Sequence, residues 1–86
     1  MLKIYGSMLC KDCVACVADL ERAEAEFEFC DFAASLLYLK EFLAIRDSSP
    51  LFDDARQQGY IGIPCIVAED GTVSLSWSEY VSQADA

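Results

Sequence analysis

The sequence predicts a small α/β protein in which a four-stranded mixed sheet carries helices on both faces. Four short runs of alternating or apolar residues, at 2–5, 27–32, 61–68 and 72–75, are typical of strands. Helical periodicity separates the first three runs, whereas the Asp70-Gly71 hairpin signal separates the last two. Helical crossovers join parallel strands and tight turns join antiparallel ones, so we expect a mixed sheet.

Each helix is predicted from its apolar spacing and its end signals. The helix from 11 to about 25 is expected to bury Cys13, Val14, Val17 and Leu20. A second helix, from a Ser35 N-cap to about residue 46, is expected to bury Leu36, Leu39, Phe42 and Leu43. Pro50 suits the first turn of a short helix that Gly59 ends, and residues 76–79 match a capping box that opens a last helix to about Ser82.

Composition limits the classes of function. With 86 residues and 55% apolar residues, the chain has enough apolar material for one packed domain, 1–86. Lys plus Arg number 6 against 15 Asp plus Glu, and the net charge of −9 argues against nucleic acid and anionic membrane surfaces as partners. There is no histidine, so no imidazole serves as base or metal ligand. No run approaches the ~20 apolar residues of a membrane span.

Cysteine placement is the strongest chemical signal. Two residues, Lys11 and Asp12, separate Cys10 from Cys13. The pair follows the first strand directly and lies at the start of the first helix. A helix N-terminus stabilises a thiolate, and a second thiol one turn away can close a disulfide with the first. Pro64, at the mouth of the third strand, is a candidate cis peptide. Together these residues favour thiol–disulfide chemistry.

The remaining cysteines leave a metal site open as an alternative. Cys16 follows Cys13 by three residues, so Cys10, Cys13 and Cys16 are three thiols that can ligate zinc or an iron–sulfur cluster, with Cys65 or an external thiol as the fourth ligand. The other interpretation, which we favour, is that Cys16, Cys30 and Cys65 are small apolar core residues. Under that interpretation the protein holds no metal and no tightly bound cofactor.

With these motifs, the chain resembles the glutaredoxin branch of the thioredoxin-fold superfamily. The matching segments are Lys3-Ile4-Tyr5, the Cys10–Cys13 motif, and residues 59–64, whose sequence is Gly-Tyr-Ile-Gly-Ile-Pro. The resemblance covers nearly the whole chain and implies a thioredoxin-like fold. It also implies that Cys10 is the nucleophile, Cys13 the resolving cysteine and Pro64 a cis-proline beside the site. Ile63 would offer backbone hydrogen bonds to a bound thiol peptide.

Three further residues are predicted to contact substrate. Lys11, between the two cysteines, is the best-placed cation for an anionic group. The head of the last helix, with Ser76 and Trp77, can hold a carboxylate, although Trp77 also suits the core. The family's Gly-Gly-x-Asp stretch, which holds the γ-glutamyl end of glutathione, is replaced here by 75–78. Glutathione therefore remains only a candidate co-substrate.

The sequence thus predicts a monomeric, cytoplasmic thiol–disulfide oxidoreductase. Its expected partners are disulfide-containing proteins or low-molecular-weight thiols. The start of the chain lacks the charged and apolar regions of a signal peptide, and five cysteines without a structural disulfide pattern suit a reducing compartment. The alternative is a metal or iron–sulfur carrier that uses the same cysteines.

Overall fold

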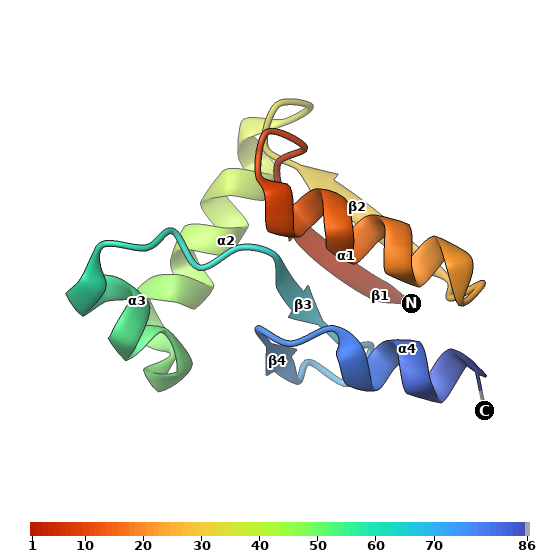
Figure 1. Ribbon diagram of the computed structural model, residues 1–86. Coiled ribbons are helices and arrows are strands. Elements are labelled where there is room, and N and C mark those ends of the chain that lie inside the picture. The colour runs from red at the N-terminus through yellow and green to blue at the C-terminus, as the bar shows by residue number, and fades with distance from the viewer. Residues whose placement is uncertain (86) are drawn as a thin grey trace.

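Four strands and five helical segments make up the part of the chain that the structure, a computed structural model, describes: residues 1–85, with side chains as far as Val81. In order these are β1 (Leu2–Gly6), α1 (Lys11–Arg22), β2 (Phe27–Asp31), α2 (Leu36–Ser48), the 3-10 helix η1 (Pro50–Phe52), α3 (Asp53–Gln58), β3 (Cys65–Val67), β4 (Val73–Ser74) and α4 (Ser78–Asp85) (Figure 1). Among the described helices, none has both the length and the apolar character needed to cross a bilayer.

The strands form one mixed sheet in the order β2-β1-β3-β4. β1 runs parallel to β2, with Ile4 opposite Phe29, and antiparallel to β3, with Tyr5 opposite Cys65. β3 and β4 form the antiparallel hairpin expected from Asp70-Gly71, and Gly71 has a φ of 91° in that turn. The predicted mixed α/β sheet is confirmed.

Helices cover both faces of this sheet, and a separate core lies under each layer (Figure 1). Alternation along β1 sends Ile4 to one face and Tyr5 to the other. Ile4 packs with Cys16 and Leu20 of α1 and Tyr80 of α4. On the opposite face lies the second core, made of Tyr5, Cys30, Phe42, Phe52, Ala55 and Cys65, under α2, η1 and α3.

The buried faces of the two long helices differ from those predicted. In α1 the buried stripe is Cys13, Cys16 and Leu20, whereas Val14 is 43% exposed. In α2 the rings of Phe32 and Phe52 lie 5.3 and 5.9 Å from that of Phe42, which centres the buried stripe there. Tyr38, Leu39 and Ile45 flank Phe42, and Leu36 and Leu43 are exposed. Cys13 and Leu20 in α1, and Leu39 and Phe42 in α2, pack in the core as predicted. The buried faces therefore overlap with the predicted ones, because a 3.6-residue period defines the centre of an apolar stripe only approximately.

The third strand is shorter than predicted and begins only at Cys65. Gly62 has a φ of 93°, and Pro64 has no backbone N–H to donate to a strand partner. The carbonyls of Tyr60 and Ile61 accept hydrogen bonds from the Arg46 side chain instead of from a strand. Residues 61–64 therefore form a loop in front of β3, which is the segment that the candidate site uses.

Candidate active site

The pairing of the central strands β1 and β3 brings Cys10 and Pro64 to the same end of the sheet. Gly6 ends β1, and Ser7–Cys10 form a turn in which the Cys10 N–H donates to the Ser7 carbonyl at 3.0 Å. β3 runs antiparallel to β1, so the beginning of β3 lies beside the end of β1, with Cys65 opposite Tyr5. The turn before α1 and the loop before β3 therefore meet, although more than fifty residues separate them in the sequence. The Ile63–Pro64 peptide bond is cis, as expected.

Cys10 is the N-cap residue of α1. Its backbone is extended, with φ −95° and ψ 125°, and its carbonyl accepts the first helical hydrogen bond from the Val14 N–H at 3.1 Å. The Cys10 side chain makes no capping hydrogen bond in the structure, although an N-cap side chain lies near the free N–H groups of the second and third helical residues, here Asp12 and Cys13. The positive end of the helix dipole favours negative charge at the same place. Cys10 thus occupies the position on the helix where a thiolate is best stabilised, and it is partly exposed.

Cys13 lies one turn further and is fully buried. Burial raises the pKa of its thiol to about 12; a hydrogen bond from the backbone of Ser7 opposes this, and the neighbouring Cys10 side chain adds to it. At neutral pH Cys13 therefore keeps its proton. The two thiols are chemically distinct, because Cys10 is open to substrate while Cys13 is protonated and shielded behind it.

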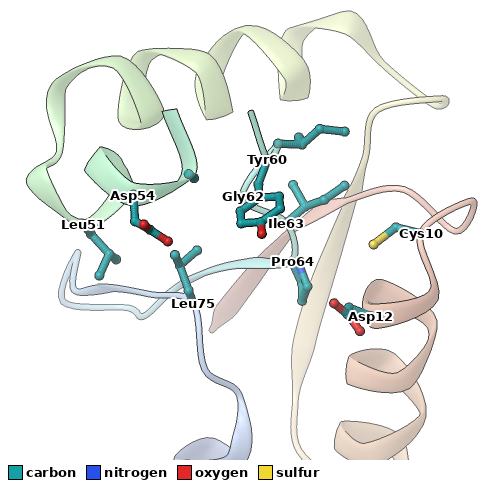
Figure 2. Close-up of a pocket in the computed structure, with 11 residues that line it drawn as sticks. Cys10, Asp12, Leu51, Asp54, Tyr60, Gly62, Ile63, Pro64 and Leu75 are labelled. Atoms are coloured by element: carbon teal, nitrogen blue, oxygen red, sulfur yellow. The ribbon is translucent and has the colours of Figure 1, made fainter. Parts of the chain in front are cut away.

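A cavity of about 490 Å³ opens in front of Cys10. Figure 2 shows the Cys10 sulfur at one end beside Asp12, with Ile63 and Pro64 next to it. The cavity is lined by the start of α1, by η1 and α3, by the loop before β3 and by the residue after β4. The lining residues are Cys10, Asp12, Leu51, Asp54, Ala55, Tyr60, Ile61, Gly62, Ile63, Pro64 and Leu75. Three of the predicted site residues, Cys10, Ile63 and Pro64, are brought together here.

Lys11, Ser76 and Trp77 lie elsewhere. Lys11 is exposed in the first turn of α1, and it is its neighbour Asp12 that lines the cavity. Trp77 packs against the core beneath α1 and α4, and its indole N–H donates to an Asp19 carboxylate oxygen at 2.9 Å. Together with hydrogen bonding from Arg22, which is the larger cause, this contact lowers the pKa of Asp19. Trp77 thus fastens α4 to α1 on the face of the sheet opposite α3.

The last helix begins later than its predicted capping box implies. α4 starts at Ser78, and the Trp77 carbonyl accepts from the Val81 N–H at 3.2 Å, so Trp77 is the N-cap residue instead of Ser76. The Ser76 hydroxyl lies 3.2 Å from the Ser78 hydroxyl. The Ser74 hydroxyl accepts from the Ser76 N–H, which ties this segment to β4.

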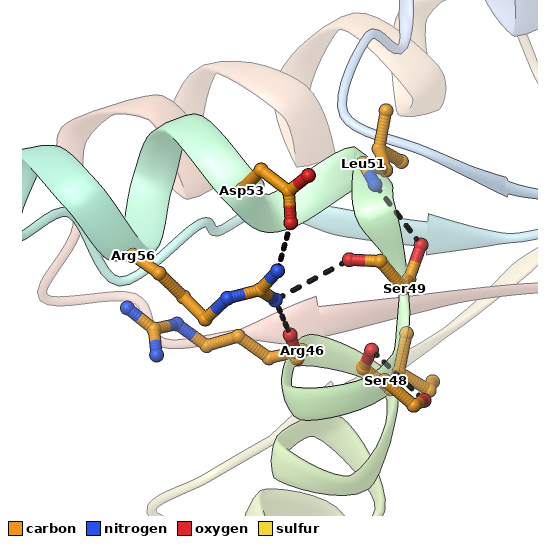
Figure 3. A network of polar contacts seen from close by, with 7 residues as sticks. Arg46, Ser48, Ser49, Leu51, Asp53 and Arg56 are labelled. Carbon is orange, nitrogen blue, oxygen red and sulfur yellow. Dashed lines mark hydrogen bonds and ion pairs between the residues drawn. The ribbon is translucent and has the colours of Figure 1, made fainter.

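Two arginines hold the far wall of the cavity in place. Arg46, near the end of α2, donates through Nε to the Ile61 carbonyl at 2.8 Å and through Nη2 to the Tyr60 carbonyl at 2.6 Å. Arg56 of α3 in turn donates to the backbone carbonyls of Arg46 and Ser49 and pairs with Asp53 (Figure 3). The carbonyls at the end of α2 and before β3 are satisfied in this way by side chains.

The other cysteines are core residues, as the favoured interpretation predicts. Cys16, Cys30 and Cys65 are fully buried. Burial raises the pKa of Cys16 and Cys30 to about 11 and that of Cys65 to about 12. Among the residues whose side chains the structure describes, 1–81, no group of three or more Cys, Asp or Glu is suited to hold a metal ion.

Asp12 and Asp54 are site residues that the sequence did not reveal. Both carboxylates line the cavity, Asp12 from the first turn of α1 and Asp54 from the first turn of α3. In the sequence each is an acid in the first turn of a helix, where acids are common. Asp54 shares the cavity with Cys10 because the chain runs from α3 directly into the loop before β3, which also lines the cavity.

Comparison with known proteins identifies a relative that matches most of the chain. The chain is 37% identical over 76 residues to an "Uncharacterized protein" of Haemophilus influenzae, and the match covers 88% of each chain. The protein belongs to the family of that relative. No protein-family model matches the sequence, and no solved structure matches it significantly. The name of this relative describes no activity.

Proposed function

We propose that the protein is a glutaredoxin-like thiol–disulfide oxidoreductase with a thioredoxin-like fold, which reduces disulfides through Cys10 and Cys13. The observation that carries the proposal is the asymmetry of the two thiols: Cys10 is accessible at the N-cap of α1, and Cys13 is buried directly behind it. A dithiol reductant needs one thiol that attacks and one that is protected until the first has reacted.

The reaction consists of two exchanges. The Cys10 thiolate attacks one sulfur of the substrate disulfide; a Cys10–substrate disulfide forms, and the second substrate sulfur leaves as a thiolate that takes up a proton. Cys13 then gives up its proton and attacks the Cys10 sulfur, which releases the remaining substrate thiol. The substrate gains two electrons and two protons, and the protein is left with a Cys10–Cys13 disulfide.

The protein groups around the cavity have separate parts in these steps. The first turn of α1 offers N–H groups and the helix dipole to the Cys10 thiolate, as attacking and as leaving group. The loop through Ile63 and Pro64 forms the wall beside which the substrate sulfur would approach. A thiol of a second protein or of a small molecule would then reduce the Cys10–Cys13 disulfide back to the dithiol. Glutathione is one candidate for this small molecule. A reducing cytoplasm suits this cycle.

A count of the free thiols before and after oxidation tests the proposal. The reduced protein is treated with a mild disulfide oxidant, alkylated and analysed by mass spectrometry, with metal analysis on the same sample. We expect loss of two hydrogen atoms mapped to Cys10 and Cys13, no stoichiometric metal, and no disulfide exchange by Cys10→Ser. Cys13→Ser should accumulate the mixed disulfide at Cys10.

A matched control uses Cys16, which lies one turn beyond Cys13 in the same helix. Cys16→Ala should keep disulfide exchange if the dithiol alone does the chemistry. Retention of full activity by Cys10→Ser would refute the oxidoreductase proposal. Stoichiometric zinc or iron that disappears in Cys16→Ala would support a carrier function instead.

A further inference from the structure

The cavity in front of Cys10 carries negative charge at both ends. Asp12 lies beside the Cys10 sulfur, and Asp54 lies at the opposite end, near Leu51 and Leu75 (Figure 2). Among the described residues that line the cavity, none is Lys or Arg. The two arginines nearest its far wall are occupied, because Arg46 donates to the Tyr60 and Ile61 carbonyls and Arg56 pairs with Asp53.

Between the two carboxylates the floor of the cavity is apolar or backbone. It is built from Gly62, Ile63, Pro64 and Leu75. Large apolar side chains that line the cavity are left partly in water: Tyr60 is 62% exposed, Ile61 58% and Leu51 44%. A small charged thiol would leave most of this rim uncovered, whereas a polypeptide segment would cover it.

From this arrangement we propose that the preferred substrate is a disulfide in a polypeptide segment that carries a Lys or Arg side chain near its cysteine. The proposal rests on the oxidoreductase function above. The cysteine would meet Cys10, apolar neighbours would cover the rim, and the cationic side chain would reach Asp54 along the cavity floor or pair with Asp12. Glutathione disulfide, which carries several carboxylates, would be disfavoured by both aspartates.

The net charge of −9 acts in the same direction over a longer range. It attracts basic segments and repels acidic ones from any approach, but it is screened beyond about 10 Å at 0.1 M salt. The local contribution of Asp54 and Asp12 must therefore be separated from the global charge, which a distant control variant achieves.

The experiment uses two sets of three peptides, and the peptides of one set differ in one residue. Each peptide has a Ser- and Ala-based sequence with a single cysteine that is activated as its 2-pyridyl disulfide. Lys, Gln or Glu occupies the second position before the cysteine in one set and the second position after it in the other. Single-turnover rates of the fully reduced protein are followed by release of pyridine-2-thione, and glutathione activated as the same 2-pyridyl disulfide is measured in parallel. Modification of Cys10 is verified by mass spectrometry.

We expect the rate order Lys, Gln, Glu, with a Lys-to-Glu ratio of about tenfold at low salt that shrinks at 0.5 M salt, since salt screens exposed charge pairs. Asp54→Asn should reduce that ratio about threefold, and Asp54→Asn combined with Asp12→Asn should reduce it further. Glu21→Gln removes the same charge from the exposed far end of α1 and should leave the ratio nearly unchanged.

Equal rates for the three peptides, with Cys10 modified in each case, would overturn the charge preference and leave the oxidoreductase function standing. The same conclusion would follow if the ratio were lowered equally by Glu21→Gln and Asp54→Asn, or if the 2-pyridyl disulfide of glutathione reacted faster than that of the Lys peptide. Absence of reaction at Cys10 with every peptide would overturn both proposals.

Discussion

The Cys13 sulfur packs directly against the backbone of Gly6. A Cβ added to Gly6 would lie 2.5 Å from Cys13 Sγ and 3.6 Å from the Phe29 ring. Gly6 ends β1, so the last residue of the strand leaves the room in which the buried thiol sits behind Cys10. A glycine is needed here for close approach, because any side chain would fill the place of the thiol.

Gly6→Ala is expected to displace Cys13 and to destabilise the fold by about 1–3 kcal/mol, the usual cost of overpacking. Chemical denaturation measures this cost. In the double variant Gly6→Ala with Cys13→Ala the clash is relieved, so the two changes should couple by more than ~0.5 kcal/mol. Additive effects would show that Cys13 is not what makes Gly6 necessary.

Gly62 meets two demands that only glycine satisfies. Its φ is 93°, and an added Cβ would lie 2.8 Å from the Phe52 ring. Gly62→Ala should therefore lower the free energy of unfolding by about 2–4 kcal/mol, as backbone strain and a ring clash combine. Gly71→Ala is the matched control, since Gly71 has a φ of 91° but nothing within 4 Å of the added atom. An equal loss in both variants would contradict a role for Phe52.

The buried thiols predict loss of stability at alkaline pH. In the folded protein Cys13 and Cys65 have pKa values of about 12, and Cys16 and Cys30 about 11, all raised first by burial. In the unfolded chain they ionise near 9.0. The unfolded state therefore loses protons that the folded state keeps, and stability falls as pH rises from about 9 toward 11, by up to ~1.4 kcal/mol per pH unit for each thiol.

Denaturation at pH 8, 9 and 10 under anaerobic, reducing conditions measures this slope. Cys65→Ala removes one of the titrating thiols and should flatten the pH dependence, whatever it does to stability at pH 8. A slope that is unchanged in Cys65→Ala would mean that its thiol is not held protonated by the fold.

Arg46 is predicted to act as a positioning residue for the cavity wall. Arg46→Met removes its two hydrogen bonds to the Tyr60 and Ile61 carbonyls, and the loop before β3 should loosen. Exchange with a peptide disulfide should slow several-fold, whereas alkylation of Cys10 by iodoacetamide should keep its rate. Lys40→Met, which removes an exposed charge from the same helix, should change neither rate. Equal slowing of both reactions in Arg46→Met would indicate a general loss of structure.

Local signals in the chain were enough to predict the order of the helices and strands and three of the residues that line the cavity, Cys10, Ile63 and Pro64. The Cys10–Cys13 spacing, the short strand before it and the Ile63-Pro64 pair before β3 were recognisable because each is a short-range pattern. The parallel and antiparallel pairings followed from connection length. The sheet order β2-β1-β3-β4 then brings Cys10 and Pro64 together.

Tertiary structure decided which side of each helix is buried and what surrounds the thiol. A 3.6-residue period defines an apolar stripe only approximately, so Val14, Leu36 and Leu43, which the sequence predicts as buried, are exposed, and Tyr38 and Ile45 pack against the core instead. Asp54 shares the cavity with Cys10 because β3, which follows α3 and its loop, pairs with β1 next to Cys10, a contact between distant segments. The sequence by itself determined the strands, the helices and the cysteine pair. Long-range packing alone determined the charge and shape of the space in front of Cys10.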